Sequence, residues 1–592
     1  MLNAVVKWSI AQRWLVVIAS ILILLWGFRV LTQMPLDVFP NFAPPQVEIQ
    51  TEATGLAPEE VESLVTRPIE SAINGTPGVE KVRSSSAVGI SVVKVIFTWD
   101  TDIYRARQLV TERLQQAQSQ LPKGVGIPQI SPISSPIGAI AKYAFTIEEG
   151  GKTDLMEVRR IVDWQVKNRL LAVSGVTQVV IFGGDIRQYQ VLVDPVKLQQ
   201  YDVTLSAVTE AARKANVNAA GGFLTSPDRE LLIRGIGRIE SAEQLQKSVI
   251  KSQKGVPVLL SQVADVRIGA ELKRGDGNLN GKKSVVVIVN KQPNADTPSV
   301  TRAVEIAIAE IKQGLPSDVK VETTFRQEEF IEASLKNVEE SLRDGTIIVS
   351  VVLILFLMNW RTAIISLSAI PISLLLGMMV LSWTGQGINT MTLGGLAVAI
   401  GSVVDDAIVD MENVYRRLRE NQLAGTPVPP LEVVFNGSVE VRVSVLFSTV
   451  IIAVVFAPIF ALSGVEGRIF TPMGVAYLLS IVASTLVALT LTPALCALLL
   501  VNRPLPPDET WLAHKSQQVY RPALVFAIRR PSIILGVAIA ALIASMIILP
   551  SLGRVFLPEF QERSLVISTV LYPGVSLATT NQVSLVVEEH LK

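Results

Sequence analysis

The sequence has little of what builds disulfides and zinc sites. Its single cysteine, Cys496, cannot form an internal disulfide, and its two histidines, His514 and His590, lie far apart. A zinc site of histidine and cysteine ligands needs several such residues at defined spacing. The sequence therefore nearly excludes this class of site.

Charge and phosphate-binding motifs are also scarce. Charged residues make up 18% of the chain and the formal net charge is +1. A nucleic-acid-binding protein needs a concentrated basic surface, so nucleic acid is not an expected partner. No Gly-x-x-x-x-Gly-Lys motif occurs, which argues against direct use of ATP, and we expect no cofactor.

Apolar residues are abundant instead, at 49% of the chain, and they gather in runs. A helix needs about 20 apolar residues to cross a bilayer. The runs of suitable length are 14–31, 345–360, 363–383, 388–413, 441–462, 473–500 and 531–550. We therefore predict an α-helical polytopic membrane protein with about seven transmembrane helices in the lipid bilayer.

The fourth apolar run contains four carboxylates: Asp405, Asp406, Asp410 and Glu412. A charge at the centre of a bilayer costs roughly 2.5–3.5 kcal/mol, and such residues usually serve ion or proton movement. Helical spacing places Asp405 and Glu412 on one face and Asp406 and Asp410 on a second. We expect a proton relay. A solvated Asp410 and an interfacial ion pair between Glu412 and Arg416 are the alternatives.

Lysine and arginine are unevenly distributed among the connecting segments. They gather in the N-terminal tail and in the segments after the fourth and sixth runs, which lie on one side if the spans alternate. The positive-inside rule makes that side cytoplasmic. The long segment between the first two runs is then external.

The external segment has an α+β pattern. Alternating strands and helical spacing give the order strand, helix, strand, strand, helix from residue 46 to 121, which is typical of a ferredoxin-like βαβ unit. A second such unit is predicted from Ala139 to Pro195, with the helix Leu155–Ala172 between two strands. Strands and a helix near residues 284–326 look like the later part of the same architecture. The stretch 205–280 has its own helix–strand pattern and is predicted to be an inserted module.

An internal repeat links the two ends of the chain. Arg13-Trp-Leu opens the first run and Arg530-Pro-Ser opens the seventh, while the stretch 39–42 corresponds to 557–560 and Gly55 to Gly574. With repeats of equal size, a complete molecule would have on the order of a thousand residues. We therefore expect one repeat and a truncated second one, so that relay partners in the second repeat are missing.

Three stretches carry a family resemblance. They are Ala399–Asn413 in the fourth run, Met34–Pro40 after the first run, and Ser463–Phe470 between the fifth and sixth. With the arrangement of spans, they resemble the resistance-nodulation-division (RND) superfamily of efflux pumps over essentially the whole chain. Within it the chain looks most like the heavy-metal efflux branch, the copper/silver and cobalt–zinc–cadmium pumps.

The resemblance implies a fold, a location and partners. It implies a proton/cation antiporter, not an enzyme, that forms a homotrimer in the inner (plasma) membrane with a periplasmic adaptor (membrane fusion) protein and an outer-membrane channel. The implied division is the tail and first span (1–31), periplasmic pore subdomains (32–204), a docking-like module (205–280), the end of the pore region (281–344), the second to sixth spans (345–500), a cytoplasmic linker (501–530), the seventh span (531–550) and the start of a second periplasmic repeat (551–592).

The resemblance does not identify the metal. Copper and silver pumps line their route with methionines, whose soft thioethers suit Cu(I). Met391 matches one such position, but Ser568 and Ile481 stand at two others, and Ala399 replaces an acid of the divalent-metal pumps. An RND pump for organic compounds, a non-transporting RND relative and an inert truncated product are the alternatives.

Overall fold

The computed structural model describes residues 2–591 apart from 38–39, 41, 134–137, 236, 254, 274, 294, 425–426, 502, 506–510, 554–564 and 573. The chain divides into two compact units. The first comprises Met1–Gly138, Lys291–Thr301 and Arg326–Ile567, and the second comprises Ala139–Asn290, Arg302–Phe325 and Ser568–Lys592.

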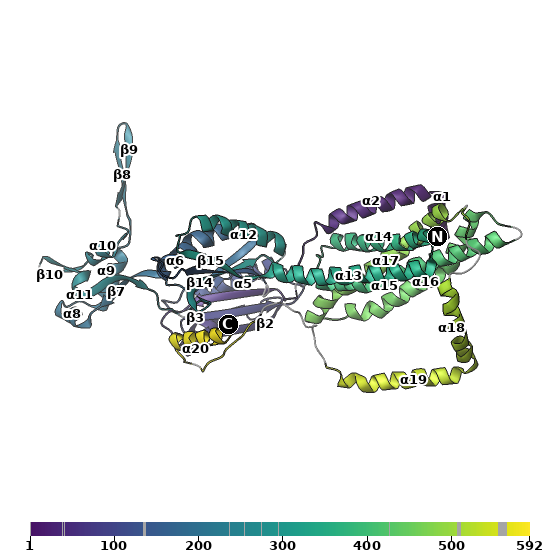
Figure 1. Cartoon of the computed structure of the whole chain (residues 1–592). Coiled ribbons are helices and arrows are strands. Elements are labelled where there is room, and N and C mark those ends of the chain that lie inside the picture. The colour runs from purple at the N-terminus through teal and green to yellow at the C-terminus, as the bar shows by residue number, and fades with distance from the viewer. Residues whose placement is uncertain are drawn as a thin grey trace. The chain divides into compact units, whose positions relative to one another are not determined.

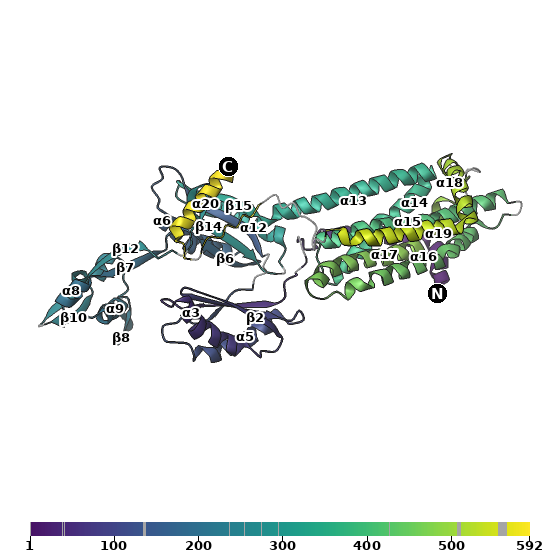
Figure 2. The same ribbon diagram turned by 90° about the horizontal axis from the view of Figure 1, so that it is seen from below.

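The first unit contains a four-stranded sheet. Its strands are β1 (Gln46–Glu52), β2 (Val79–Ala87), β3 (Ile90–Phe97) and β4 (Gln129–Ile130), in the order β2-β3-β1-β4. Helices α3 (Pro58–Val61), α4 (Arg67–Ile73) and α5 (Ile103–Gln118) pack on this sheet, and Figure 2 shows α3 and α5 on the same face. This order confirms the predicted ferredoxin-like unit, because alternating apolar residues of β1 and β3 meet the apolar faces of the helices.

The second unit has a sheet with the same strand order. Strand β6 (Val176–Phe182) pairs with β14 (Lys282–Lys291), which is followed by β5 (Ala139–Ile147) and β15 (Val319–Arg326). Its helices are α6 (Leu155–Ile161), α7 (Lys167–Leu171) and α12 (Thr297–Gln313). A second ferredoxin-like arrangement is therefore present. It does not end at Pro195, as the sequence predicted, because it is interrupted between β6 and β14 and takes its last two strands from residues 282–326.

The interruption is a small module with its own core. Strands β7 (Arg187–Val193) and β12 (Ala264–Ala270) pair and enclose α8 (Pro195–Gln200), α9 (Leu205–Lys214) and α10 (Ala242–Gln246). The β10–β11 pair (Val249–Gln253, Val256–Leu259) and the β8–β9 hairpin (Ala219–Ser226, Arg229–Gly235) complete it (Figure 1). The sequence predicts that the module begins at residue 205. It begins earlier, at β7, because β7 pairs with the distant strand β12 and this pair closes the module.

The first unit also contains the membrane helices. By length and composition, the described residues include six candidate spans: α2 (Arg13–Leu31), α14 (Trp360–Trp383), α15 (Thr390–Leu423), α16 (Pro430–Phe460), α17 (Gly464–Leu499) and the segment Pro531–Ser551 that begins with α19 (Pro531–Ile548). Six of the seven predicted runs fall in these candidate spans. The run 345–360 falls at the end of α13 (Gln327–Leu357), where Glu340, Arg343 and Asp344 precede a short apolar end.

Helix α15 lies against α14, α16 and α17 in the bundle (Figure 1). Small residues permit this close packing, as is common for membrane helices. A Cβ atom added at Gly395 of α15 would lie 2.3 Å from the carbonyl oxygen of Met473 on α17. The predicted linker 501–530 contains one more helix, α18 (Trp511–Arg529).

Candidate functional site

The four carboxylates of α15 lie on two faces, as their spacing predicts. Asp410 is 4% exposed and Asp406 is half-buried, whereas Asp405 and Glu412 are exposed. The pair Asp406 and Asp410 therefore faces the neighbouring helices of this bundle. A solvated Asp410, one of the two alternatives from the sequence, is not what the structure shows.

Asp410 shares a buried site with a positively charged residue. Arg442 and Ser438 of α16 line the same small cavity as Asp410, with a volume of about 10 Å³, which is room for about one water molecule. Arg442 is 5% exposed, and its Nη1 donates to the carbonyl oxygen of Leu2 at 3.2 Å. Among the described residues, Asp410 Oδ2 and Arg442 Nε have no hydrogen-bond partner.

Asp406 has a weaker partner on α17. The hydroxyl of Ser484 lies 3.3 Å from Asp406 Oδ2 and 3.4 Å from the carbonyl oxygen of Val403. Ser484 is 2% exposed, so this contact is shielded from the surface of the chain. Asp406 and Asp410 thus face α17 and α16 respectively, through groups that hydrogen bonding only partly satisfies.

Beyond Asp410, towards its C-terminal end, α15 takes part in a denser network of polar side chains. Arg417 donates to both oxygens of Glu440 on α16, from Nε at 2.9 Å and from Nη2 at 2.5 Å, and its Nη1 lies 3.1 Å from Glu420 Oε2. Asn413 donates to the carbonyl oxygen of Gly437 at 2.7 Å and accepts from Arg416 at 2.7 Å. The predicted Glu412–Arg416 ion pair stays a prediction.

The structure brings in two residues that sequence reasoning missed. Arg442 sat in the first turn of a predicted span, so a lone charge inside an apolar run was the signal that could have found it. Ser484 gives no comparable signal, because serine is common in membrane helices. Met391, the predicted substrate-path residue, is half-buried at the start of α15, and its backbone N–H is bonded to Asn389 Oδ1 at 3.0 Å.

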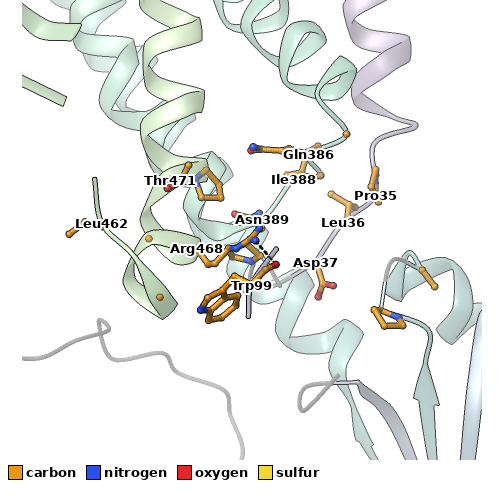
Figure 3. A pocket seen from close by; sticks show the side chains of 18 of the residues that line it. Pro35, Leu36, Asp37, Trp99, Gln386, Ile388, Asn389, Leu462, Arg468 and Thr471 are labelled. Carbon is orange, nitrogen blue, oxygen red and sulfur yellow. Dashed lines mark hydrogen bonds between the residues drawn. The ribbon is translucent and has the colours of Figure 1, made fainter. Parts of the chain in front are cut away.

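A larger cavity of about 700 Å³ lies at the other end of α15 (Figure 3). Asp37, Trp99, Lys291, Asn389 and Arg468 are among its lining residues. Figure 3 shows Arg468 beside Trp99; its guanidinium lies 5.5 Å from the ring centroid and donates to the Trp99 carbonyl oxygen at 3.4 Å. Lys291 is 3% exposed and lies 2.6 Å from Asp37 Oδ2.

Asp296, which follows the lining residue Ala295, is held as an anion. Burial by itself raises the pKa of Asp296, but hydrogen bonds from the backbone of Leu36 and from Ser299, with the charge of Lys291, bring the net pKa below its usual value. The bond from Leu36 N is 2.8 Å long. Within the described residues, no group of three or more His, Cys, Asp and Glu side chains could hold a metal ion.

Comparison with known proteins identifies the fold family. The AcrB/AcrD/AcrF family matches residues 5–592. The chain belongs to this family. Over 99% of its length it also resembles a crystal structure described as a heavy metal efflux pump, with a TM-score of 0.82, 30% identity and coverage of 56% of that chain.

Family relatives are similar in sequence over the whole chain. The chain is 33% identical to the cation efflux system protein CzcA of Alcaligenes sp. (strain CT14) over 610 residues, 100% of this chain and 56% of the relative. It is 34% identical to the cation efflux system protein CusA of Escherichia coli (strain K12), over 98% of this chain and 56% of the relative. The chain thus spans about half the length of these relatives, and the predicted heavy-metal branch of the RND superfamily is confirmed.

The structure describes only part of the predicted internal repeat. The stretch 557–560 and residues 39 and 41 of the repeat motif lie outside the described residues. The candidate spans and the family together make this a membrane protein.

Proposed function

We propose that this chain acts in an inner-membrane transporter that exports heavy-metal cations in exchange for protons. The observation that carries the proposal is the buried Asp410 beside the buried Arg442, inside membrane-spanning helices. A buried carboxylate in such a helix is expensive and serves ion or proton movement in most proteins that retain one. The substrate class comes from relatives named as cation efflux proteins.

The geometry favours a proton-dependent change in helix packing. While Asp410 is ionised, its charge offsets that of Arg442 in a site with little water. Proton uptake removes one charge and leaves Arg442 buried without an opposite charge, which is strongly unfavourable. Helices α15 and α16 then pack better in a different arrangement, so the protonation state selects between two structures.

Asp406 extends this relay towards α17 through Ser484. Asp405 and Glu412 are on the exposed face of α15, where they serve the relay only if another part of the transporter covers that face. Met391 is retained as a soft ligand in the substrate path. These roles for Asp405, Asp406, Asp410, Glu412 and Met391 rest on position and chemistry.

The proposed surroundings follow the family and the charge distribution. The two ferredoxin-like sheets and the inserted module are periplasmic, and the arginine-rich end of α15 is cytoplasmic. The transporter is a homotrimer that works with a periplasmic adaptor and an outer-membrane channel. The second candidate, a pump for organic compounds, is favoured by Ser568 and Ile481 at positions where copper and silver pumps have methionines.

The test compares a strain that lacks the gene with the same strain carrying it at its own locus. We expect the deletion to lower tolerance to one or more of Co, Ni, Zn, Cd, Cu and Ag, and not to dyes and detergents. Sensitivity to dyes and detergents alone would establish the organic-compound pump instead. Sensitivity to neither class would point to a non-transporting relative or an inert product.

A further inference from the structure

Two of the stretches that carry the family resemblance contribute nothing to the carboxylate site. Both line the 700 Å³ cavity at the other end of α15. The stretch Met34–Pro40 contributes Pro35, Leu36, Asp37 and Pro40, and the stretch Ser463–Phe470 contributes Ser463, Gly464, Gly467 and Arg468. Residues 385–389, which directly precede α15, complete this part of the wall. Residues of both stretches therefore line one cavity next to the first turn of α15.

Backbone hydrogen bonds fasten the segment after α2 to that turn. Leu36 and Ile388 form an isolated parallel bridge, in which Asp37 N donates to Ile388 O at 3.0 Å and Ile388 N donates to Pro35 O at 2.9 Å. The next residue, Asn389, caps α15 by accepting from Thr392 N at 2.9 Å. A displacement of α15 along its axis therefore acts directly on residues 35–37.

Lys291 also holds the segment after α2 in place, through bonds of its side chain. It is the last residue of β14, it is 3% exposed, and its ammonium group lies 2.6 Å from Asp37 Oδ2 and 2.9 Å from the Ala295 carbonyl oxygen. Asp296, a few residues on, accepts from Leu36 N at 2.8 Å. A buried ammonium is tolerated only when it is well paired, so these bonds fix the geometry closely.

We propose that Asp37, Lys291 and Asp296 are positioning residues that make the first turn of α15 and the segment after β14 move together. This inference rests on the proposed function, in which proton uptake displaces α15. The ion pair and the bonds to Leu36 and Ile388 then transmit that displacement to Lys291–Thr301. Through Lys291 the movement enters β14, because the chain is continuous there.

We call this connection between the first turn of α15 and the segment after β14 the joint. The chain offers a matched control for it. Lys320 and Glu148 form an ion pair of the same length, 2.6 Å, but their side chains are 62% and 42% exposed. Lys320→Met removes an ion pair as Lys291→Met does, without disturbing the wall of the cavity. An exposed pair contributes little to stability, whereas breaking a buried pair is strongly destabilising.

The first measurement is amide hydrogen exchange on the purified chain in lipid nanodiscs. We expect Lys291→Met to speed exchange of residues 34–37 and also of residues 386–392 by roughly tenfold or more, because both depend on one joint. Lys320→Met should leave both segments unchanged, and Lys291→Arg should stay close to the parent protein. Faster exchange at 34–37 with unchanged exchange at 386–392 would overturn the proposal.

Asp37→Asn is the second variant, for the case in which Lys291→Met does not accumulate. Its side chain is 28% exposed, so the substitution perturbs packing less while it removes the charge partner of Lys291. It should speed exchange of the same two segments to a smaller extent. No change in either segment would overturn the proposal.

The second measurement places the same variants in the deletion strain. We expect Lys291→Met to reduce metal tolerance to that of the deletion strain at unchanged protein level, while Lys320→Met retains it. Normal tolerance together with faster exchange would show a joint that is not used in transport, against the proposal. If the parent gene gives no metal tolerance, the proposed function fails, and the exchange measurement still decides whether the joint exists.

Discussion

Helix α15 carries charge at two levels, and the two levels are built differently. At the middle level, Asp410 and Arg442 are buried and have atoms without hydrogen-bond partners among the described residues. At the arginine-rich level, Arg417 makes two bonds to Glu440 and a third to Glu420, with side chains that are 42–51% exposed. Exposed charges can be removed with little effect on how two helices pack, however well they are paired, whereas buried and sparsely paired charges make the packing depend on a single proton.

The largest effect is expected at the middle level from Asp410→Asn. This variant keeps the shape of the side chain and permanently removes the charge that proton binding would remove. We expect metal tolerance to fall to that of the deletion strain while the protein still accumulates in the membrane, measured by growth and immunoblot. Tolerance that survives would show that Asp410 takes no part in the relay.

Arg442→Met tests whether the two buried residues depend on each other. Leaving a buried carboxylate without a nearby opposite charge typically costs about 3–5 kcal/mol, so the variant should lose much of its thermal stability in nanodiscs. The double variant Asp410→Asn/Arg442→Met should recover most of that loss, since neither charge remains. Independent, additive losses would mean that Asp410 and Arg442 do not interact.

A smaller effect is expected from Ser484→Ala. Ser484 donates one hydrogen bond to Asp406, and bonds to charged groups contribute about 1.5–3 kcal/mol. Transport, measured as metal efflux from loaded vesicles, should slow, and the bundle should lose less thermal stability than Arg442→Met does. Ser480→Ala is the matched control, because the Ser480 hydroxyl bonds only within α17, to Ala476 O, among the contacts that the structure describes. An equal effect of both variants would remove Asp406 from the relay.

The smallest effect is expected at the arginine-rich level from Glu440→Gln. Ion pairs between exposed side chains contribute about 0–1 kcal/mol, so both stability and metal tolerance should stay close to those of the parent protein. Thermal unfolding and growth on metal salts check this. A loss of tolerance comparable to that of Asp410→Asn would break the distinction between the two levels.

The sequence predicts the parts of this molecule in which the pattern is local. Alternating residues in β1 and β3 and the helical spacing around Val110 are enough to predict the first ferredoxin-like sheet, because each element carries its own buried face. The spacing of the carboxylates likewise predicts two faces of α15. It does not say which face points inward, because that depends on which helices pack against α15.

Other features depend on contacts between distant residues. The β7–β12 pairing that closes the inserted module joins Arg187–Val193 to Ala264–Ala270, and no local pattern predicts this pairing. The contact between Ser484 and Asp406 and the bond from Leu36 to Asp296 are of the same kind. The run 345–360 is ambiguous for a different reason. This apolar stretch of marginal length continues a charged helix, α13, and periodicity does not separate the two.

The interrupted second sheet has a consequence for the order in which the chain folds. Strands β1, β2 and β3 follow one another closely, whereas β6 must wait for β14 until residues 183–281 have been synthesised. Pairings between residues distant in sequence form slowly, because the intervening chain must be brought together first. The first sheet should therefore be complete on the ribosome or at the translocon while β5 and β6 still present unpaired edges. Because of those edges, the second sheet is most exposed to misassembly in the interval before β14 emerges.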